Sequence, residues 1–250
     1  MNRTSVILVA GLFSVAVGVY MTRRSVPPAA PEPVAPAPAP AQTGPAPVAA
    51  PVAAAAPVPL DASDDWARKL GADLSSQAGW SSWLKEEDLV RRLAAGVDTL
   101  AHGGSPSESL PFLVPRKRFT VVRGEDGRMY ADPRSFKRYD AAAQIFTSID
   151  PEKAAAAYRL AKPLLQQACG ELGSGPCDFD AKLAKALGGL LAAPSTDGQF
   201  ELRDKGALYA FADRRLESLS DAQKLLIRTG PRNQPRIQGH LRKLKTALGL

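Results

Sequence analysis

Histidine and cysteine are scarce in this chain, with two of each among 250 residues. A metal centre needs about four ligands at characteristic spacing, and the sequence contains no HExxH motif, no CxxC motif and no paired histidines. It also lacks a GxxxxGK[ST] phosphate loop, a GxGxxG motif after a strand and a GxSxG elbow. These absences argue against metalloenzymes, nucleotide hydrolases, dinucleotide enzymes and α/β-hydrolases, and the sequence predicts no cofactor and no metal.

The nearest approach to a catalytic pair is Asp98 with His102, which lie four residues apart and so share one helix face. A carboxylate in this position could orient the imidazole as a general base, but no nucleophile accompanies the two residues. The favoured alternative is structural, with His102 close to the C-terminal end of a helix dipole and Asp98 in a local hydrogen bond. The sequence therefore favours a protein that is not an enzyme.

A long hydrophobic run occurs at the beginning of the chain. Residues Ser5–Met21 carry no charge over seventeen positions, Arg3 precedes them, and Arg23 and Arg24 follow. This run predicts an uncleaved membrane anchor over residues 1–24, with one transmembrane helix. A cleavable signal peptide is the rival interpretation, although its small-residue site at Ala16–Gly18 would fall inside the apolar run. The flanking positive charges nearly balance, so they do not decide the orientation.

Residues 25–60 are rich in proline and alanine and contain no repeating bulky residue that could form a core. Proline removes backbone donors and favours polyproline II, so this segment predicts a disordered linker. An extended linker of this length spans on the order of 100 Å at about 3.1 Å per residue, enough to cross part of a bacterial envelope. A PxxP ligand for a cytoplasmic adaptor is the alternative, but the flanking basic residues that give such ligands specificity are missing.

Residues 61–250 predict a mainly α, single globular helical domain of about seven helices with a small inserted β-hairpin. Ser63 is expected to cap the first helix, and Phe119–Arg123 with Arg128–Ala131 form the hairpin around a turn. Leu110–Pro115 is expected to be an extended buried connector, and Pro163 to kink or interrupt its helix. The apolar spacing places helices near 66–74, 86–101, from 133, from 151, 179–191, 221–228 and 234–248, with a strand-like piece at Phe200–Arg203.

Several short motifs resemble a bacterial family catalogued as domain of unknown function 3014. They are Leu110–Pro115, Arg138–Asp140, Phe179–Ala181, Tyr209–Asp213, Leu219–Lys224 and Gly230–Pro231. The similarity covers nearly the whole of residues 60–249, and the family shares the layout of anchor, linker and C-terminal domain. The chain departs from the family pattern at Ser220–Asp221, where Ser-Pro is expected. The resemblance implies an envelope protein with its domain outside the inner membrane, but it brings no activity, cofactor or catalytic residue.

Positive charge is concentrated near the C-terminus. The formal net charge is +7, and residues 214–250 hold nine Lys/Arg against Glu217 and Asp221. Aromatic residues are missing from this segment, which argues against nucleic acid and favours anionic lipid headgroups or acidic envelope polymers as partners. The alternative is a solvated helix face. The last helix is expected to pack through an inward stripe of Ile237, Leu241, Leu244 and Leu248. The cations on its other faces are the candidate contacts for an anionic partner: Arg236, Arg242, Lys243 and Lys245.

Cys169 and Cys177 flank a short connection that contains three glycines and one proline. If the domain faces an oxidising periplasm, the two residues are expected to form a disulfide, and two free thiols are the alternative.

Three hypotheses of function follow. The first is a non-enzymatic, membrane-tethered interaction or scaffold protein of the bacterial cell envelope, with a single pass through the inner membrane and a periplasmic C-terminal domain. The second is an envelope enzyme of the cell-wall hydrolase type, which requires a cleft with convergent ionisable groups. The third is an anchored adaptor that faces the cytoplasm.

Overall fold

The structure is a computed structural model that describes residues 56–173, 177–206 and 208–250. The predicted anchor and most of the predicted linker lie outside the described residues. Within those three ranges, no helix combines the length and apolar character needed to cross a membrane. The last predicted linker residue, Leu60, is buried in the core, so the packed domain begins slightly earlier than expected.

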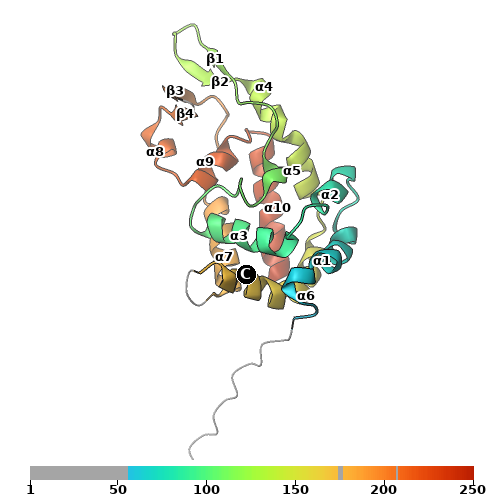
Figure 1. Ribbon diagram of the computed structural model, residues 1–250. Coiled ribbons are helices and arrows are strands. Elements are labelled where there is room, and N and C mark those ends of the chain that lie inside the picture. The colour runs from blue at the N-terminus through green and yellow to red at the C-terminus, as the bar shows by residue number, and fades with distance from the viewer. Residues whose placement is uncertain (1–55, 174–176, 207) are drawn as a thin grey trace, which may run out of the picture. The chain divides into compact units, whose positions relative to one another are not determined.

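Helices form most of the described chain (Figure 1). The α-helices are α1 (Asp64–Gly71), α2 (Ala78–Trp83), α3 (Leu89–Ala101), α4 (Pro133–Phe136), α5 (Asp140–Thr147), α6 (Pro151–Glu171), α7 (Phe179–Leu191), α8 (Arg214–Glu217), α9 (Asp221–Ile227) and α10 (Asn233–Leu248). Short 3-10 turns are η1 (Leu60–Ala62), η2 (Ala72–Leu74), η3 (Pro111–Leu113) and η4 (Lys137–Tyr139). These segments outnumber the seven or so expected, because α2 and α8 are too short to show a periodic apolar pattern.

The predicted hairpin is half of a larger sheet. Strands β1 (Val121–Arg123), β2 (Met129–Ala131), β3 (Glu201–Lys205) and β4 (Leu208–Phe211) pair antiparallel in the order β1-β2-β3-β4. Tyr130 of β2 lies opposite Glu201 of β3, so the strand-like piece near Phe200 completes the sheet. An isolated two-stranded hairpin is marginally stable in water, and the partner strands supply the pairing that it lacks.

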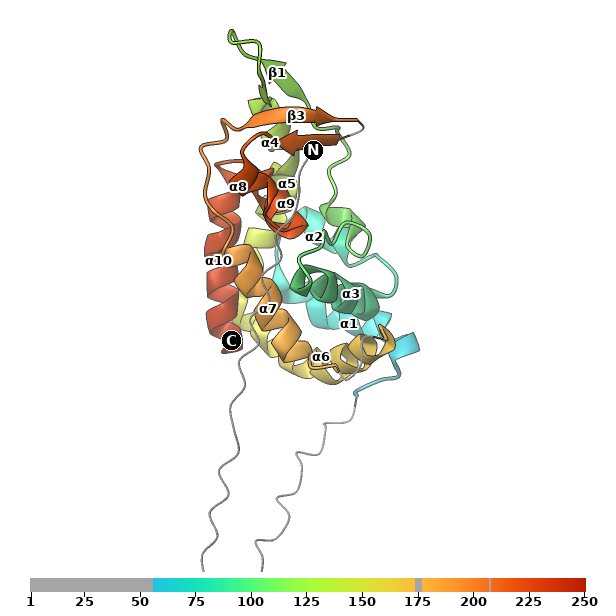
Figure 2. The ribbon, with the colours of Figure 1, turned by 90° about the vertical axis from the view of Figure 1, so that its left-hand side faces the viewer.

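Two hydrophobic clusters hold the domain together. The larger one joins α3, α6 and α7 through fully buried residues such as Ala94, Leu164 and Phe179. The smaller one lies against the sheet and includes Phe211 and Ile227. The sheet occupies one end of the domain and helices α1, α3 and α6 the other, with α10 running between them (Figures 1 and 2). Helix α10 packs against α5, α6 and α7.

Local caps explain where several helices begin. The Asp150 side chain accepts hydrogen bonds from the backbone N–H groups of the first turn of α6, and Asp178 does the same for α7. Ser220 and Gln223 form a complete capping box on α9, so the departure from Ser-Pro leaves this helix start intact. At the family motif Gly230–Pro231, Gly230 has φ 91° and a Cβ atom there would collide with the Phe136 ring, which explains the glycine.

Two local expectations were wrong, and a third was wrong in part. Ser63 does not cap α1, because its hydroxyl donates to the Leu60 carbonyl at 2.6 Å. Leu110–Pro115 is not an extended buried connector: Pro111 starts the turn η3, and Val114 is 47% exposed. Pro163 does not interrupt its helix, since α6 continues as one segment from Pro151 to Glu171, and the expected kink stays a prediction.

Candidate ligand-binding cavity

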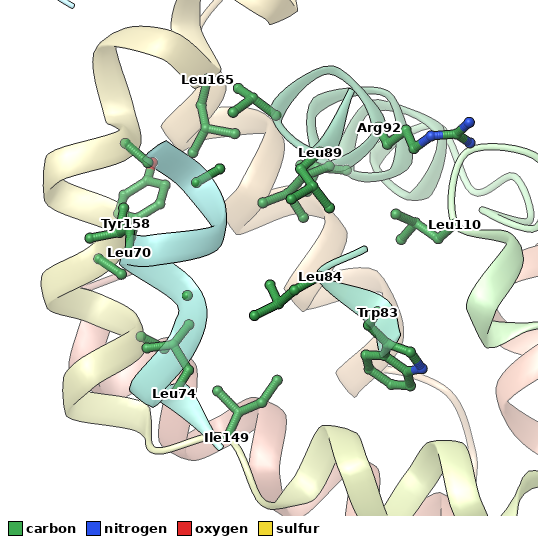
Figure 3. A pocket seen from close by; sticks show the side chains of 18 of the residues that line it. Leu70, Leu74, Trp83, Leu84, Leu89, Arg92, Leu110, Ile149, Tyr158 and Leu165 are labelled. Carbon is green, nitrogen blue, oxygen red and sulfur yellow. The ribbon is translucent and has the colours of Figure 1, made fainter. Parts of the chain in front are cut away.

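A cavity of about 420 Å³ lies among helices α1, α2, α3, α5, α6, α7 and α10. Its lining is almost wholly aliphatic and aromatic, and Figure 3 shows Leu70, Leu74, Leu84, Leu89 and Leu165 around the open space. Four of these five leucines are only half-buried, and Leu165 is buried. The helical end of the domain therefore encloses apolar space that its own side chains do not fill.

All three tryptophans of the chain line this cavity. Trp66 comes from α1, and Trp80 and Trp83 come from α2, where their ring centroids lie 6.0 Å apart. The Trp80 indole donates to the Gly71 carbonyl at 2.8 Å, and Trp83 packs on Phe112 at 4.8 Å between centroids. Trp80, Trp83 and Phe112 thus form one aromatic cluster in the lining.

The lining contains one charged residue, Arg92, and one phenol, Tyr158. Arg92 donates from Nε to the Glu87 carbonyl at 2.8 Å, and its guanidinium points away from the cavity (Figure 3). The Tyr158 hydroxyl donates to Asp180, and burial together with this carboxylate raises the pKa of Tyr158. The interior is therefore almost free of hydrogen-bonding capacity.

The cavity reaches the surface beside α3, where the lining residue Leu93 is 46% exposed. The loop between α2 and α3 borders this region and is fixed by Arg68 of α1. Its guanidinium donates to the Leu84 carbonyl at 2.9 Å and to the Glu86 carbonyl at 3.1 Å. Helix α1 therefore positions both its own lining residues and those of the loop.

The four predicted contacts on α10 do not form one surface. Arg236, Arg242 and Lys243 are exposed, but Lys245 is half-buried. At 100° per residue, Arg236 and Lys243 share a face, whereas Arg242 and Lys245 point elsewhere. None of the four makes an ion pair with another described residue. On another side of the helix, the predicted inward stripe includes the buried Leu241, and Leu241, Leu244 and Leu248 all line the cavity.

Cys169 and Cys177 form a disulfide in the structure, with their Cα atoms 5.9 Å apart. Cys169 is 1% exposed at the end of α6, and Cys177 lies just before α7. The bond joins two helices that both contribute to the cavity wall. Its formation in solution stays a prediction, because it depends on the compartment.

The Asp98–His102 pair has the geometry of a structural contact. The His102 Nδ1 atom lies 3.5 Å from the Asp98 carboxylate and 2.8 Å from the Asp98 carbonyl. The same carboxylate forms an ion pair with Lys182 of α7. Asp98 therefore ties α3 to α7, which supports the structural alternative. Among the described residues, no group of three or more His, Cys, Asp or Glu side chains could hold a metal ion.

A row of buried polar residues on α10 could not be recognised from the sequence. Gln234 donates to the Pro194 carbonyl at 2.8 Å, and Gln238 to the Ala193 carbonyl at 2.9 Å, so both glutamines satisfy acceptors beyond the end of α7. His240 is 5% exposed and packs edge-on against Phe146. Burial, assisted by nearby Lys243, lowers the pKa of His240, and its Nε2 atom has no partner among the described residues.

The geometry defines a mainly helical domain with a small antiparallel sheet and an apolar cavity that opens to the surface. A family profile described as "Protein of unknown function (DUF3014)" matches residues 89–245, more than half of the chain. The chain belongs to this family. No curated protein and no solved structure matches it. The matched region includes α3, α6, α7 and α10 of the cavity wall but not the tryptophan-bearing helices α1 and α2.

Proposed function

We propose that the protein is a non-enzymatic, membrane-tethered interaction protein of the bacterial cell envelope whose domain binds the aliphatic chain of a lipid-like ligand. In this proposal, residues 1–24 anchor the chain in the inner membrane and the domain lies in the periplasm. The observation that carries the proposal is the apolar cavity. An envelope domain held by a tether of this length stays within reach of bilayer lipids.

The chemistry of the lining selects the class of ligand. A volume of about 420 Å³ lies within the range of about 300–1,000 Å³ typical of small-molecule sites. Each buried methylene contributes about 0.8 kcal/mol of transfer free energy. A polar group in the same place would lose its water and find no partner, because Tyr158 is engaged by Asp180 and Arg92 points outward. These facts favour a hydrocarbon chain with its polar end at the opening.

The lining also supports binding over catalysis. Its one charged side chain, Arg92, has no carboxylate, histidine or cysteine beside it in the lining. A wall hydrolase would need convergent ionisable groups around its substrate, and the lining of this apolar cavity does not supply them.

The binding proposal can be tested on the full chain in cell membranes with a fatty acid that carries a diazirine in its chain. After irradiation, labelled peptides are expected to contain lining residues such as Leu84 and Leu89. Ala157 lines the cavity, so Ala157→Phe fills part of it and should lower the labelling of these peptides. Ala156 is exposed on the same helix and outside the lining, so Ala156→Phe is the matched control.

Labelling spread over exposed surface peptides, or equal labelling of the two variants, contradicts the proposal. The location requires a separate test, with a compartment-sensitive reporter fused to the C-terminus. A periplasmic signal supports the proposed topology, and a cytoplasmic signal supports the alternative of an adaptor that faces the cytoplasm.

A further inference from the structure

A second cavity, of about 650 Å³, lies at the sheet end of the domain and is strongly basic. Five of its eight lining residues are cationic: Lys117, Arg118, Arg134, Lys137 and Arg138. Lys117 and Arg118 precede β1, Arg134 is on α4, and the last two are on η4. Three segments within residues 117–138 therefore bring their positive charges to one hollow, far in the sequence from the cations of α10.

Most of this charge is not neutralised by the protein. Of the five cations, Arg134 alone has an ion pair with a described residue, at 3.0 Å from the buried carboxylate of Asp132. Asp132 also accepts hydrogen bonds from the Arg134 backbone at 2.9 Å and the Thr120 hydroxyl at 3.1 Å. Its negative charge is thus fully engaged, and the other four cations give the hollow a net positive charge.

Arg138 is held rigidly at the edge of the hollow. It donates from Nη1 to the Lys117 carbonyl at 2.9 Å, and its guanidinium lies over the rings of Phe119 and Tyr139 at 5.2 and 4.8 Å. Its Nε atom is buried and has no partner among the described residues. Its Nη2 atom donates to the Tyr139 hydroxyl at 3.2 Å. A guanidinium whose position is fixed by stacking and by these hydrogen bonds is pre-organised to attract an anion.

Two hydroxyl groups complete the lining. The Ser135 Oγ atom accepts from the Thr120 backbone N–H at 2.7 Å and lies 2.8 Å from the Thr120 hydroxyl. Ser135 is buried, so this pair fixes the segment before β1 against α4. The cations on both segments consequently keep their relative positions, as a binding site requires.

We infer that this basic hollow binds a phosphoryl group. A phosphomonoester carries close to two negative charges and several acceptor oxygens, which matches several cations and N–H donors better than a single carboxylate does. The source of the group is a lipid headgroup or free phosphate, since both present the same chemistry. This site is separate from the apolar cavity, and the inference does not depend on the proposed function.

The test uses the full chain in neutral detergent and titrates it calorimetrically at low salt with two probes, inorganic phosphate and short-chain phosphatidic acid. The variant Arg118→Gln/Lys137→Gln removes two exposed lining charges. The control Arg159→Gln/Lys185→Gln removes two exposed charges from α6 and α7, outside the hollow. We expect the first variant to weaken binding by at least about tenfold and the control to leave it nearly unchanged.

The two probes also identify the source of the phosphoryl group. Equal affinity for both indicates free phosphate, and tighter binding of phosphatidic acid indicates a headgroup. Absence of binding by either probe at low salt, or equal weakening in the control, overturns the inference. Because all four substituted side chains are exposed, circular dichroism of the variants is expected to match that of the original chain.

Discussion

The Asp64 carboxylate at the start of α1 accepts hydrogen bonds from the backbone N–H groups of Asp88 and Leu89, both at 2.9 Å. These donors belong to the beginning of α3, so one helix caps another. Asp88 has a positive φ of 54°, and no side chain within its own segment caps α3. The capping residue of α3 is therefore 25 positions away in the sequence.

Replacing Asp64 with alanine should expose this dependence. Two backbone donors would lose their acceptor, and we expect the free energy of unfolding to fall by about 1–2 kcal/mol. The neighbouring Asp65 pairs with Arg68 at the exposed surface, so Asp65→Ala should change stability by less than about 0.5 kcal/mol. Urea unfolding followed by circular dichroism measures the change in the free energy of unfolding for both variants. A loss of equal size in both variants would show that the interhelical cap contributes nothing specific.

Intrinsic fluorescence offers a direct assay of the apolar cavity. All three tryptophans line it, so the emission of the whole chain reports from this one place. A fatty acid brominated on its chain is expected to quench the emission saturably, whereas its unbrominated counterpart should compete and restore it. The Ala157→Phe variant should need a higher concentration of the brominated fatty acid for half-maximal quenching than the Ala156→Phe control. Linear, non-saturating quenching would mean that no site is occupied.

The Cys169–Cys177 disulfide closes a short loop, which in the chain-entropy model stabilises the fold by about 2 to 3 kcal/mol. Protein purified without reductant should therefore show no reactive thiols after denaturation, and reduction should lower its stability by that amount. The double variant with serine at both positions is expected to match the reduced protein. Two reactive sulfhydryls in the untreated protein would rule out the bond.

Helix positions were predictable where the controlling residues are neighbours in the sequence. Asp150, Asp178 and Ser220 each cap a helix within three residues, and the inward stripe of α10 repeats at helical spacing. The sheet was only half predictable, because Tyr130 pairs with Glu201 about seventy residues later. No local pattern encodes such a register.

The candidate sites were less predictable than the fold. The apolar cavity exists because seven helices leave space between them unfilled, and its leucines have the spacing of ordinary core residues. The basic hollow was not predictable for another reason: its cations are spread over residues 117–138, and Arg138 is brought next to the segment of Arg118 by a hydrogen bond to the Lys117 carbonyl. Gln234 and Gln238 gave no signal that they would be buried.

His240 predicts a pH dependence of stability. Burial lowers its pKa in the folded state, so below about pH 6.5 the unfolded chain binds a proton that the folded chain resists. Stability should therefore fall as the pH drops from 7 to 5.5, by at most about 1.4 kcal/mol per pH unit for this group. Urea unfolding at pH 7 and pH 5.5 measures this loss. The free energy of unfolding of the His240→Leu variant should fall less between the two pH values than that of the original chain. An identical loss in the variant would assign the effect to other groups.

The outward face of α10 remains the predicted contact for anionic lipid headgroups or envelope polymers, but the structure narrows it to Arg236 and Lys243. Lys245 is half-buried, so reversing its charge would also disturb packing. For the unit Pro51–Leu250 on its own, Arg236→Glu/Lys243→Glu should abolish binding to anionic vesicles while changing stability by less than about 0.5 kcal/mol.

The salt dependence of vesicle binding distinguishes electrostatic attraction from apolar contact. Raising the salt concentration from about 0.1 M to 1 M shortens the Debye length from about 10 Å to about 3 Å. Binding of the original unit should therefore weaken steeply over this range. The control Arg159→Glu/Lys185→Glu applies the same charge change to exposed positions on α6 and α7 and should leave vesicle binding in place. If the original unit fails to bind at low salt, or the control loses binding equally, Arg236 and Lys243 form a solvated surface with no partner of this class.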